Sequence, residues 1–200
     1  MTFEFTEDYS LENERVLLQP LTEAHENDLI QFSINEPNLW QYALLRADGP
    51  EHMKKYLDSA LNGRYNEHSY PYMVYDKRAK KYAGSTRFYD IQKDHKTTQL
   101  GYTWYGADFQ GTGLNKNCKL LMLTFAFETI GFERVEFRAD NNNARSIAAM
   151  KSIGCTVEGV LRSNCKSTTG RRDSIILGIL KDEWFGGVKE ALERKVANQH

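Results

Sequence analysis

The sequence is poor in cysteine and proline and has no long apolar run, and each shortage excludes a class of protein. The three cysteines are an odd number at spacings of 37 and 10 residues, which fits neither a disulfide framework nor a CxxC metal site. Four prolines and no Gly/Ser-rich tract leave no linker, so residues 1–200 are expected to form a single domain. No apolar segment approaches the roughly 20 residues that span a bilayer, and the acidic start lacks a basic signal region. A soluble, cytoplasmic protein that inserts in no membrane is therefore predicted.

An excess of charge of one sign is also missing. The 26 Lys and Arg residues nearly balance the 27 Asp and Glu residues, which gives a net charge of -1 and no bulk attraction for nucleic acid or anionic membrane. Neither nucleic acid nor a membrane is an expected partner, and any site for a polyanion has to be local. The five histidines show no i,i+4 or HExxH spacing, so no metal is predicted. An apolar content of 40% is enough to build a core.

The periodicity of the apolar residues predicts an α+β chain. Helices are expected from 22, from 50, from 114 to about 130, from 143 to 152, and from 181 onward. Strands are expected at 15–21, 72–75, 82–91, 97–105, 134–138, 157–161 and 174–180, with the last two joined by a turn around Thr168–Gly170. Short polar connectors favour antiparallel neighbours. The expected architecture is a sandwich of helices on a mainly antiparallel sheet.

One segment, from Trp104 to Lys119, carries a strong chemical pattern. It runs from a predicted strand through a glycine turn into the longest predicted helix. Gly111 and Gly113 allow backbone N–H groups to face a ligand, and the first N–H groups of the helix add partial positive charge. Lys116 and Lys119 occupy the first two turns, where each cation is disfavoured by about 0.3 to 1 kcal/mol unless an anion is bound. The pattern favours a phosphate site, and a glycine turn with solvated lysines is the alternative.

Two motifs that this segment lacks narrow the kind of phosphate ligand. Thr112 stands where a P-loop requires its lysine, which disfavours a nucleoside triphosphatase. Lys116 stands where the dinucleotide motif GxGxxG requires its third glycine, and the preceding strands form no βαβ unit. A pyrophosphate held at one helix of an α+β fold remains.

Read in order, the motifs resemble those of the GNAT superfamily of acyl-CoA N-acyltransferases, and within it the RimJ/RimL-like branch. The likeness covers roughly Arg15 to Trp184 and owes its specificity to the series rather than to any one motif. The matching segments are Gln110–Asn115, Asn143–Ser146, Lys151–Gly154, Glu158–Arg162, Arg172–Asp173 and Glu183–Trp184. The resemblance implies a GNAT-like sandwich with a core of about residues 15–184, a splayed central sheet, and acetyl-CoA in the gap.

The resemblance also implies a set of site residues. Loop amides would hold the pyrophosphate, the backbone of the 103–105 strand would pair with the pantetheine arm, and Asn143 would bond near the thiol end. The implied cofactor-binding residues are Thr103, Trp104, Tyr105, Gln110, Gly111, Thr112, Gly113, Leu114, Asn115, Lys116, Asn143, Ser146 and Lys151. The implied catalytic residues are Asn143 and Ser146. Ser146 is a hypothetical proton donor to the departing thiolate, and a helix-cap or helix-surface role is the alternative.

Two positions depart from the family pattern. Asn115 replaces the final small residue of the loop and could bond a phosphate or cap the helix. Met150 replaces the tyrosine that many members place seven residues after the asparagine, so no phenol is available there as an acid.

The implied function is transfer of an acetyl group from acetyl-CoA to a primary amine by direct attack on the thioester, the amine being a protein N-terminus or a small molecule. An α-amino group, with a pKa near 7.7 to 8.0, is roughly a tenth neutral at pH 7, whereas a lysine amine is almost wholly charged. The alternative, which Met150 raises, is a CoA-binding regulatory or sensing module without catalysis. A homodimer is compatible with the sequence, and no metal is required.

Further residues are candidates for the chemistry around the acceptor, each with a structural alternative as an ion pair, a core residue or a solvated face. The candidate bases are Asp90, Glu136, Asp140 and Glu158, and the candidate acceptor-cleft residues are Trp40, Tyr42 and Arg87. A basic cluster beside the last hairpin could guide an acidic substrate or the adenosine 3'-phosphate; it consists of Arg162, Lys166, Arg171 and Arg172.

Overall fold

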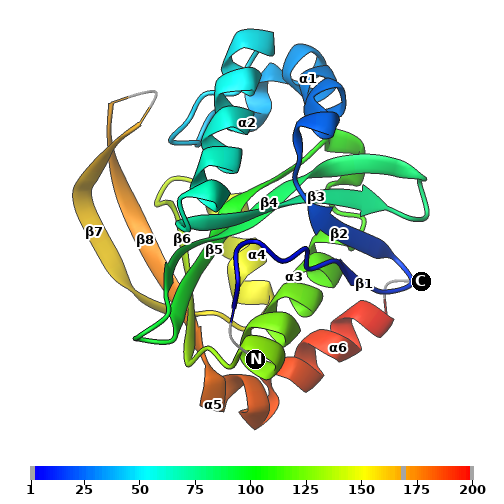
Figure 1. Ribbon diagram of the computed structural model, residues 1–200. Helices are drawn as coiled ribbons and strands as arrows, with labels where there is room; N and C mark the ends of the chain where they lie inside the picture. The colour runs from blue at the N-terminus through cyan, green and yellow to red at the C-terminus, as the bar shows by residue number, and fades with distance from the viewer. Residues whose placement is uncertain (1–2, 168–169, 199–200) are drawn as a thin grey trace.

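One mixed sheet of eight strands forms the centre of the protein, as the computed structural model shows for residues 3–167 and 170–198 (Figure 1). The strands are β1 (Leu11–Glu12), β2 (Val16–Pro20), β3 (Ser69–Asp76), β4 (Lys81–Gln92), β5 (Thr97–Tyr105), β6 (Arg134–Asp140), β7 (Thr156–Ser167) and β8 (Gly170–Leu180). Their order across the sheet is β1-β2-β3-β4-β5-β6-β8-β7. All neighbours are antiparallel except β5 and β6, which are parallel.

The helices start and stop at residues with suitable local chemistry. They are α1 (Glu26–Asn35), α2 (Pro50–Tyr65), α3 (Leu114–Thr124), α4 (Ala144–Ser152), α5 (Lys181–Glu183) and α6 (Lys189–Ala197). Pro50 begins α2, where its missing N–H costs nothing. A π-helical stretch, Phe125–Ile130, extends α3 and ends at Gly131, whose positive φ of 83° suits glycine. Short 3-10 turns occupy Glu23–His25, Pro37–Trp40 and Ala107–Phe109.

The two faces of the sheet carry separate apolar clusters. On one face, α1 and α2 lie together (Figure 1), and Leu29, Met53 and Leu57 pack with Met73 of β3 and Trp104 of β5. On the other face, α3 presents buried side chains to the sheet, and α6 packs on α3. The second cluster includes Leu114, Cys118, Met122, Val74, Phe88, Leu100 and Phe137. Helix α3 therefore lies against the sheet face opposite α2.

β5 and β6 separate along their length. They pair only over Thr97–Gln99 and Arg134–Glu136, and no further register between the two strands is present among the described residues. On its other side β5 stays paired with β4, although the register shifts between Ser85 and Arg87. Opposite this shift Tyr102 adopts a φ of +49°, an uncommon conformation for a bulky residue. The bulge and the loss of pairing leave one edge of the C-terminal half of β5 open.

The expected α+β sandwich with a mainly antiparallel sheet is confirmed. The last hairpin is longer than expected at both strands, and its predicted turn at Thr168–Gly170 falls partly on residues 168 and 169, outside the described part of the chain. The two-residue strand β1 was not predicted, because so short a pairing leaves no period in the sequence. The expected C-terminal helix is interrupted at Gly187, where φ is 133°. No helix within residues 3–167 and 170–198 is long and apolar enough to cross a membrane.

Candidate active site

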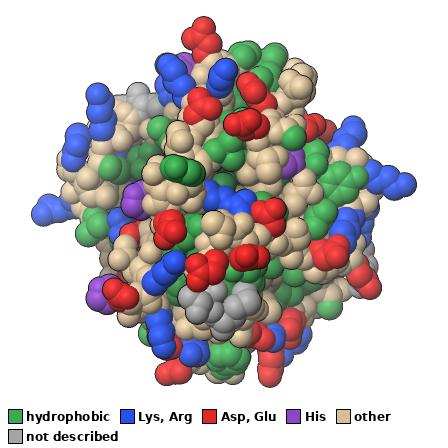
Figure 2. Space-filling view, in the orientation of Figure 1, with side chains coloured by type: hydrophobic (Ala, Val, Ile, Leu, Met, Phe, Trp, Pro, Cys, Tyr) green, Lys and Arg blue, Asp and Glu red, His purple; other side chains and the backbone are tan. Residues whose placement is uncertain are grey.

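A cavity of about 740 Å³ lies where β5 and β6 diverge. Both strands line it, together with the segment 39–45, the loop and helix start at 109–116, helix α4 and the β7–β8 hairpin. The charged side chains among its described lining residues are one acid, Asp140, and the cations Lys116, Lys119, Arg138, Arg145 and Arg172. On the face of the molecule drawn in Figure 2 the signs are mixed, with red and blue side chains interspersed. Positive charge is thus concentrated in this cavity of a protein with a net charge of -1.

The glycine turn at one end of the cavity has the backbone conformation that its sequence predicts. Gly111 and Gly113 have φ values of +74° and +88°, and Gly113 is the residue that precedes α3. The side chain of Gln110 fastens the turn, since its Nε2 donates to the carbonyl oxygen of Tyr105 at 2.8 Å and its Oε1 accepts from Arg145. The N-terminus of α3 therefore faces a turn held to both β5 and α4, an arrangement suited to an anion.

Asn115, which departs from the family's small residue, is tied to the floor of the turn. Its Oδ1 accepts a hydrogen bond from the hydroxyl of Tyr105 at 3.2 Å. Burial raises the pKa of Tyr105 well above its usual value, so the phenol stays protonated and remains a donor. This bond orients the Asn115 side chain, and Asn115 still lines the cavity.

The first turn of α4 forms the opposite wall. Asn143 caps the helix, because its Oδ1 accepts from the backbone N–H of Ser146 at 3.0 Å. Ser146 is half-buried and lines the cavity, as does Asn143. Met150 follows one turn later, buried and also facing the cavity. The hydroxyl of Ser146 is therefore not the cap of this helix, and no phenol stands at position 150.

Lys119 was expected beside the phosphate at the start of α3, but its side chain is buried. Its side chain is only 5% exposed, and its Nζ donates to the hydroxyl of Thr103 at 2.8 Å and lies 3.4 Å from that of Thr86. Burial lowers its pKa to about 8. Lys116, by contrast, is half-buried at the start of α3 and lines the cavity. Of the two lysines expected at the phosphate, one is instead a buried amine between β4 and β5.

Most of the predicted cofactor residues come together around this cavity. Those that line it are Thr103, Trp104, Tyr105, Gln110, Gly111, Gly113, Asn115, Lys116, Asn143 and Ser146. Leu114 is wholly buried in the core, so only its backbone is available. The side chain of Thr112 is exposed and its hydroxyl donates to the carbonyl oxygen of Phe109 at 2.8 Å. Lys151 is exposed on α4 and is not among the lining residues, so the structure does not bring it to the cavity.

Of the four candidate bases, only Asp140 lines the cavity, and it is buried at the end of β6. Glu136 and Glu158 are both bound to Arg134, and that guanidinium lowers the pKa of Glu158. Asp90 is exposed and accepts from the side chains of Gln92 and Gln99 at 2.7 Å each. Three of the candidates are thus structural carboxylates.

The far end of the cavity, against α2, is aromatic. Trp40 and Tyr42 line it as expected, and the ring of Trp40 meets that of Trp104 edge-on at 5.3 Å. Tyr56 of α2 accepts a hydrogen bond from Trp104 Nε1 at 3.2 Å, which fixes both side chains. Tyr102 completes this wall. Arg87 lies behind the wall, 3% exposed, rather than on it.

The basic cluster near the hairpin does not act as a unit. Arg172 is buried, lines the cavity, and donates from Nε to Ser174 Oγ at 3.0 Å. Arg171 is exposed and bonds to Ser163, and Arg162 and Lys166 are exposed as well. Only one of the four expected cations therefore faces the cavity.

A comparison with known protein families shows which family this chain belongs to. Residues 15–156, well over half of the chain, match the Acetyltransferase (GNAT) domain. The chain belongs to the GNAT acetyltransferase family. As a GNAT member it is an acetyltransferase by family, and the resemblance read from the motif series is confirmed.

Proteins similar to this GNAT chain are also named or described as acetyltransferases. A crystal structure described provisionally as an acetyltransferase is 30% identical, covers 98% of this chain and 96% of its own, and superposes with a TM-score of 0.85. YdaF of Bacillus subtilis (strain 168), named provisionally as a ribosomal N-acetyltransferase, is 27% identical over 103 residues. That alignment spans 52% of this chain and 56% of YdaF, little more than half of its length. The structure of RimL, a ribosomal L7/L12 α-N-protein acetyltransferase in complex with coenzyme A, is 18% identical, with a TM-score of 0.76 over 88% of this chain and 99% of its own.

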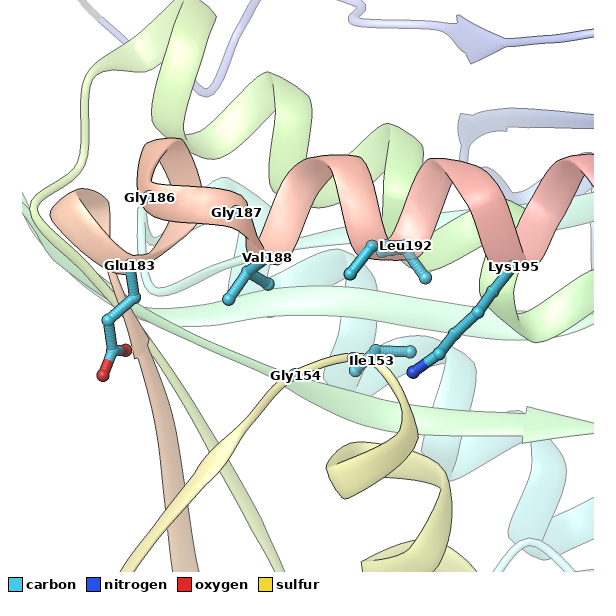
Figure 3. Close-up of a pocket in the computed structure, with 9 residues that line it drawn as sticks. Ile153, Gly154, Glu183, Gly186, Gly187, Val188, Leu192 and Lys195 are labelled. Carbon is cyan, nitrogen blue, oxygen red and sulfur yellow. The ribbon is translucent and has the colours of Figure 1, made fainter.

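A second cavity of the GNAT chain lies apart from the first, where the C-terminal segment meets the end of α4. Val188 and Leu192 point toward Ile153 at its floor, and the chain of Lys195 extends along its side (Figure 3). Lys195 Nζ donates to the carbonyl oxygen of Ser152 at 2.7 Å. Mostly apolar side chains and glycines form its lining, and Glu183 and Lys195 are the charged residues among those described there.

The sequence did not predict which side chains form the aromatic end of the cavity. Tyr56 and Tyr102 were not singled out, and the burial of Lys119 was not foreseen. Lys119 precedes the apolar residues Met122 and Leu123 by three and four positions, a helical spacing that places it on the core face and was the available sign of its burial. The β-bulge at Tyr102 has no comparable local mark in the sequence.

Proposed function

We propose that this GNAT protein transfers the acetyl group of acetyl-CoA to a primary amine. The observation that carries the proposal is the open edge of β5 beside a positively lined cavity that ends at the glycine turn. In this proposal, backbone groups of Thr103–Tyr105 bind the amide-containing arm of the cofactor. The turn at 110–115 and the start of α3 bind its diphosphate. Acetyl-CoA supplies an activated thioester, and no metal takes part.

The residues around the gap support direct transfer. The amine nitrogen forms a bond to the acetyl carbon, the carbon–sulfur bond breaks, the amine loses a proton, and the thiolate has to gain one. Ser146 is the proposed donor toward the thiolate, directly or through water, since it lines the cavity and its hydroxyl is not used as the helix cap. Asn143 holds the first turn of α4 in place. Asp140 is the proposed acceptor of the proton from the amine, because it alone of the four carboxylates lines the cavity.

The choice of acceptor is part of the proposal. An α-amino group is a better nucleophile at pH 7 than a lysine side chain, because more of it is neutral. RimL and YdaF bear names that refer to ribosomal proteins, which favours a protein N-terminus as the first acceptor to test. A small-molecule amine is the second.

A CoA-binding sensor without turnover is the competing function, and Met150 favours it, because the position is apolar and buried. Two measurements separate the candidates. Calorimetry with acetyl-CoA tests binding, and release of free thiol tests turnover with a panel of peptides and small amines. Thiol release that depends on an amine supports the enzyme; tight binding with no thiol release across the panel supports the sensor. No heat of binding at millimolar acetyl-CoA would contradict both.

The single-domain organisation of residues 1–200, the cytoplasmic location and the homodimer belong to the same proposal. The support for one domain is the continuous sheet that joins β1 to β8. Cell fractionation tests the location. Light scattering on the purified protein, with and without acetyl-CoA, tests the homodimer.

A further inference from the structure

Arg87 is a buried cation whose best hydrogen-bonding edge is unused. It projects from β4 and is 3% exposed. Its Nε and Nη2 are both buried and have no hydrogen-bond acceptor among the described residues. These two nitrogens form the edge of a guanidinium that grips a carboxylate with two parallel hydrogen bonds. A buried charge without such a partner is costly, so its presence requires a reason.

The same edge is used elsewhere in this protein, which shows what Arg87 lacks. Arg46 donates from Nε to one oxygen of Asp48 at 2.9 Å and from Nη2 to the other oxygen. Arg46 achieves this at the surface, with a side chain that is 57% exposed. Arg87 has the harder environment and no carboxylate at the corresponding nitrogens.

Aromatic rings of the cavity wall hold the guanidinium of Arg87. Its Cζ lies 4.2 Å from the ring centre of Tyr102 and 4.9 Å from that of Tyr56. Both tyrosines line the cavity. Tyr56 is fixed by Trp104, and Tyr102 stands on the β-bulge and meets the ring of Tyr89 edge-on at 5.1 Å. Cation–π contacts stabilise the charge but leave the N–H groups in the plane of the guanidinium without acceptors.

The position of Arg87 along the sheet separates it from the proposed phosphate site. Arg87 pairs in register with Gly101, whereas the glycine turn follows Tyr105, four residues farther along β5. A strand rises about 3.3 Å per residue, so the two lie about 13 Å apart along the strand. Arg87 also belongs to the sheet face that carries α2, since it contacts Tyr56, whereas Lys119 of α3 reaches Thr86 from the other face. Arg87 therefore lies on the acceptor side of the cavity rather than at the diphosphate site. It stands behind the rings of Tyr56 and Tyr102, so an anion reaches its buried Nε and Nη2 when Tyr102, which is 37% exposed, moves aside.

We infer that Arg87 is an anion receptor for the acceptor, so that the preferred amine carries a carboxylate close to its reacting nitrogen. This inference rests on the proposed acetyltransferase function and narrows its substrate class. The other charges around the cavity point the same way, because Arg172 adds positive charge and Asp140 is the one acid among the described lining residues, whereas Arg138 is paired with Glu136 at 2.6 Å. A polyamine would be repelled here, whereas an acidic peptide N-terminus or an amino acid would be attracted.

The test uses the full-length protein with saturating CoA and three small probes. N-acetyl-L-glutamate represents an acetylated acidic product, N-acetyl-L-alanine amide is its uncharged counterpart, and spermidine is cationic. Arginine Nε–H resonances of ¹⁵N-labelled protein report the contact, and Arg87→Met assigns the resonance of interest by its loss. N-acetyl-L-glutamate is expected to shift that resonance, and its affinity is expected to fall at least tenfold in Arg87→Met. Neither of the other probes is expected to shift it.

Control variants separate recognition from folding. Arg194→Met removes the same charge from a side chain that is 70% exposed on α6 and should bind the anionic probe as the wild type does. Arg87→Lys keeps the charge but loses the two-pronged edge, so it should recover only part of the affinity. In the absence of an anion, a buried guanidinium with unpaired N–H groups lowers the stability of the folded protein. Arg87→Met should therefore melt at the same temperature as the wild type or higher. If Arg87 is purely structural, Arg87→Met should instead melt lower.

Several results would overturn the inference. No shift of the Arg87 resonance at tens of millimolar N-acetyl-L-glutamate, an equal shift with the uncharged amide, or equal affinity in Arg87→Met would each do so. Calorimetry with acetyl-CoA is run in parallel on every variant. If the wild type does not bind acetyl-CoA, the proposed function is contradicted. If it binds acetyl-CoA but shows no preference for the anionic probe, only the role of Arg87 is contradicted.

Discussion

The two halves of the cavity are built by different means. The half next to α3 uses backbone: two glycines with positive φ, the start of a helix, and the open edge of β5. The half next to α2 uses side chains: an aromatic wall with a buried arginine behind it. A backbone site suits a ligand common to a whole family, because many sequences can form it. A side-chain site can change from one protein to the next, which is where the choice of acceptor has to lie.

The strongest way to break the backbone half is Gly113→Val. A β-branched residue at a φ of +88° strains the turn at a position that lines the cavity, so the affinity for acetyl-CoA should fall at least a hundredfold, about 2.7 kcal/mol. Isothermal titration calorimetry measures the loss. Gly131→Val is the matched control, since Gly131 has a similar φ of +83° and open space around it but lies at the other end of this helical segment. Equal affinities for both variants would show that this turn does not bind the cofactor.

Lys119, at the boundary between the halves, gives the next largest effect. Its pKa of about 8 lies below its usual value of 10.5, so the folded protein binds the proton less well than the unfolded chain. Stability should therefore rise from pH 8 to 10.5, by about 3 kcal/mol at most, and the penalty is fully present below pH 8. Lys119→Met removes the buried charge and leaves Thr86 and Thr103 bonded to each other at 2.7 Å. We expect it to stabilise the protein by about 2 kcal/mol at pH 7.

Denaturant unfolding of the wild type and Lys119→Met, at pH 7 and at pH 10, measures this. The difference between the two proteins isolates Lys119 from other groups that titrate in the same range. A gap that is the same at both pH values, or a variant that is less stable at pH 7, would mean that the amine is well solvated in the native state.

Ser146→Ala tests whether the wall opposite the turn contributes chemistry as well as shape. If the hydroxyl protonates the leaving thiolate, kcat should fall at least tenfold while the Kd for acetyl-CoA changes little. Steady-state thiol release at saturating acetyl-CoA measures kcat. Ser59→Ala on the exposed side of α2 is the matched control. An unchanged kcat would end the proposed role of Ser146.

Thr112→Ala gives the smallest expected effect and sharpens the view that the turn binds through backbone. The Thr112 side chain is exposed, and its hydrogen bonds to described residues are one within the turn and one, at 3.5 Å, to Arg15. Its removal should change the affinity for acetyl-CoA less than threefold, about 0.6 kcal/mol. A larger loss by calorimetry would mean that the hydroxyl itself contacts the ligand.

Local features of the sequence predicted the backbone half well. Gly111 and Gly113 act through backbone conformations that need only their near neighbours, so their positive φ values followed from the sequence. Asn143 was expected near the thiol end by resemblance, and its role as the cap of α4 was not predicted. The α+β class followed in the same way from the periods of strands and helices. Lys151 was expected at the cofactor and lies outside the described cavity lining, because its exposed position on α4 depends on how that helix packs.

The side-chain half could be predicted only in part. Trp40 and Tyr42 were foreseen as lining residues, but the contact of Arg87 with Tyr56 and Tyr102 joins three elements that are far apart in the sequence. It depends on the bulge in β5, and a bulge reflects the register of two strands rather than the residues of one. The burial of Lys119 depends equally on the strands above it. Distant pairings of this kind leave no periodic pattern.

The three-residue seam between β5 and β6 has a consequence for the cooperativity of the molecule. With so few ladder bonds across it, the sheet consists of two blocks, β1–β5 and β6–β8, joined mainly by α3 and by side chains. A ligand that bridges the gap would act as a substitute strand and let the blocks melt together. Those amide hydrogens of 100–105 that point into the gap rather than toward β4 should then exchange with solvent rapidly in the free protein and slowly once the gap is filled.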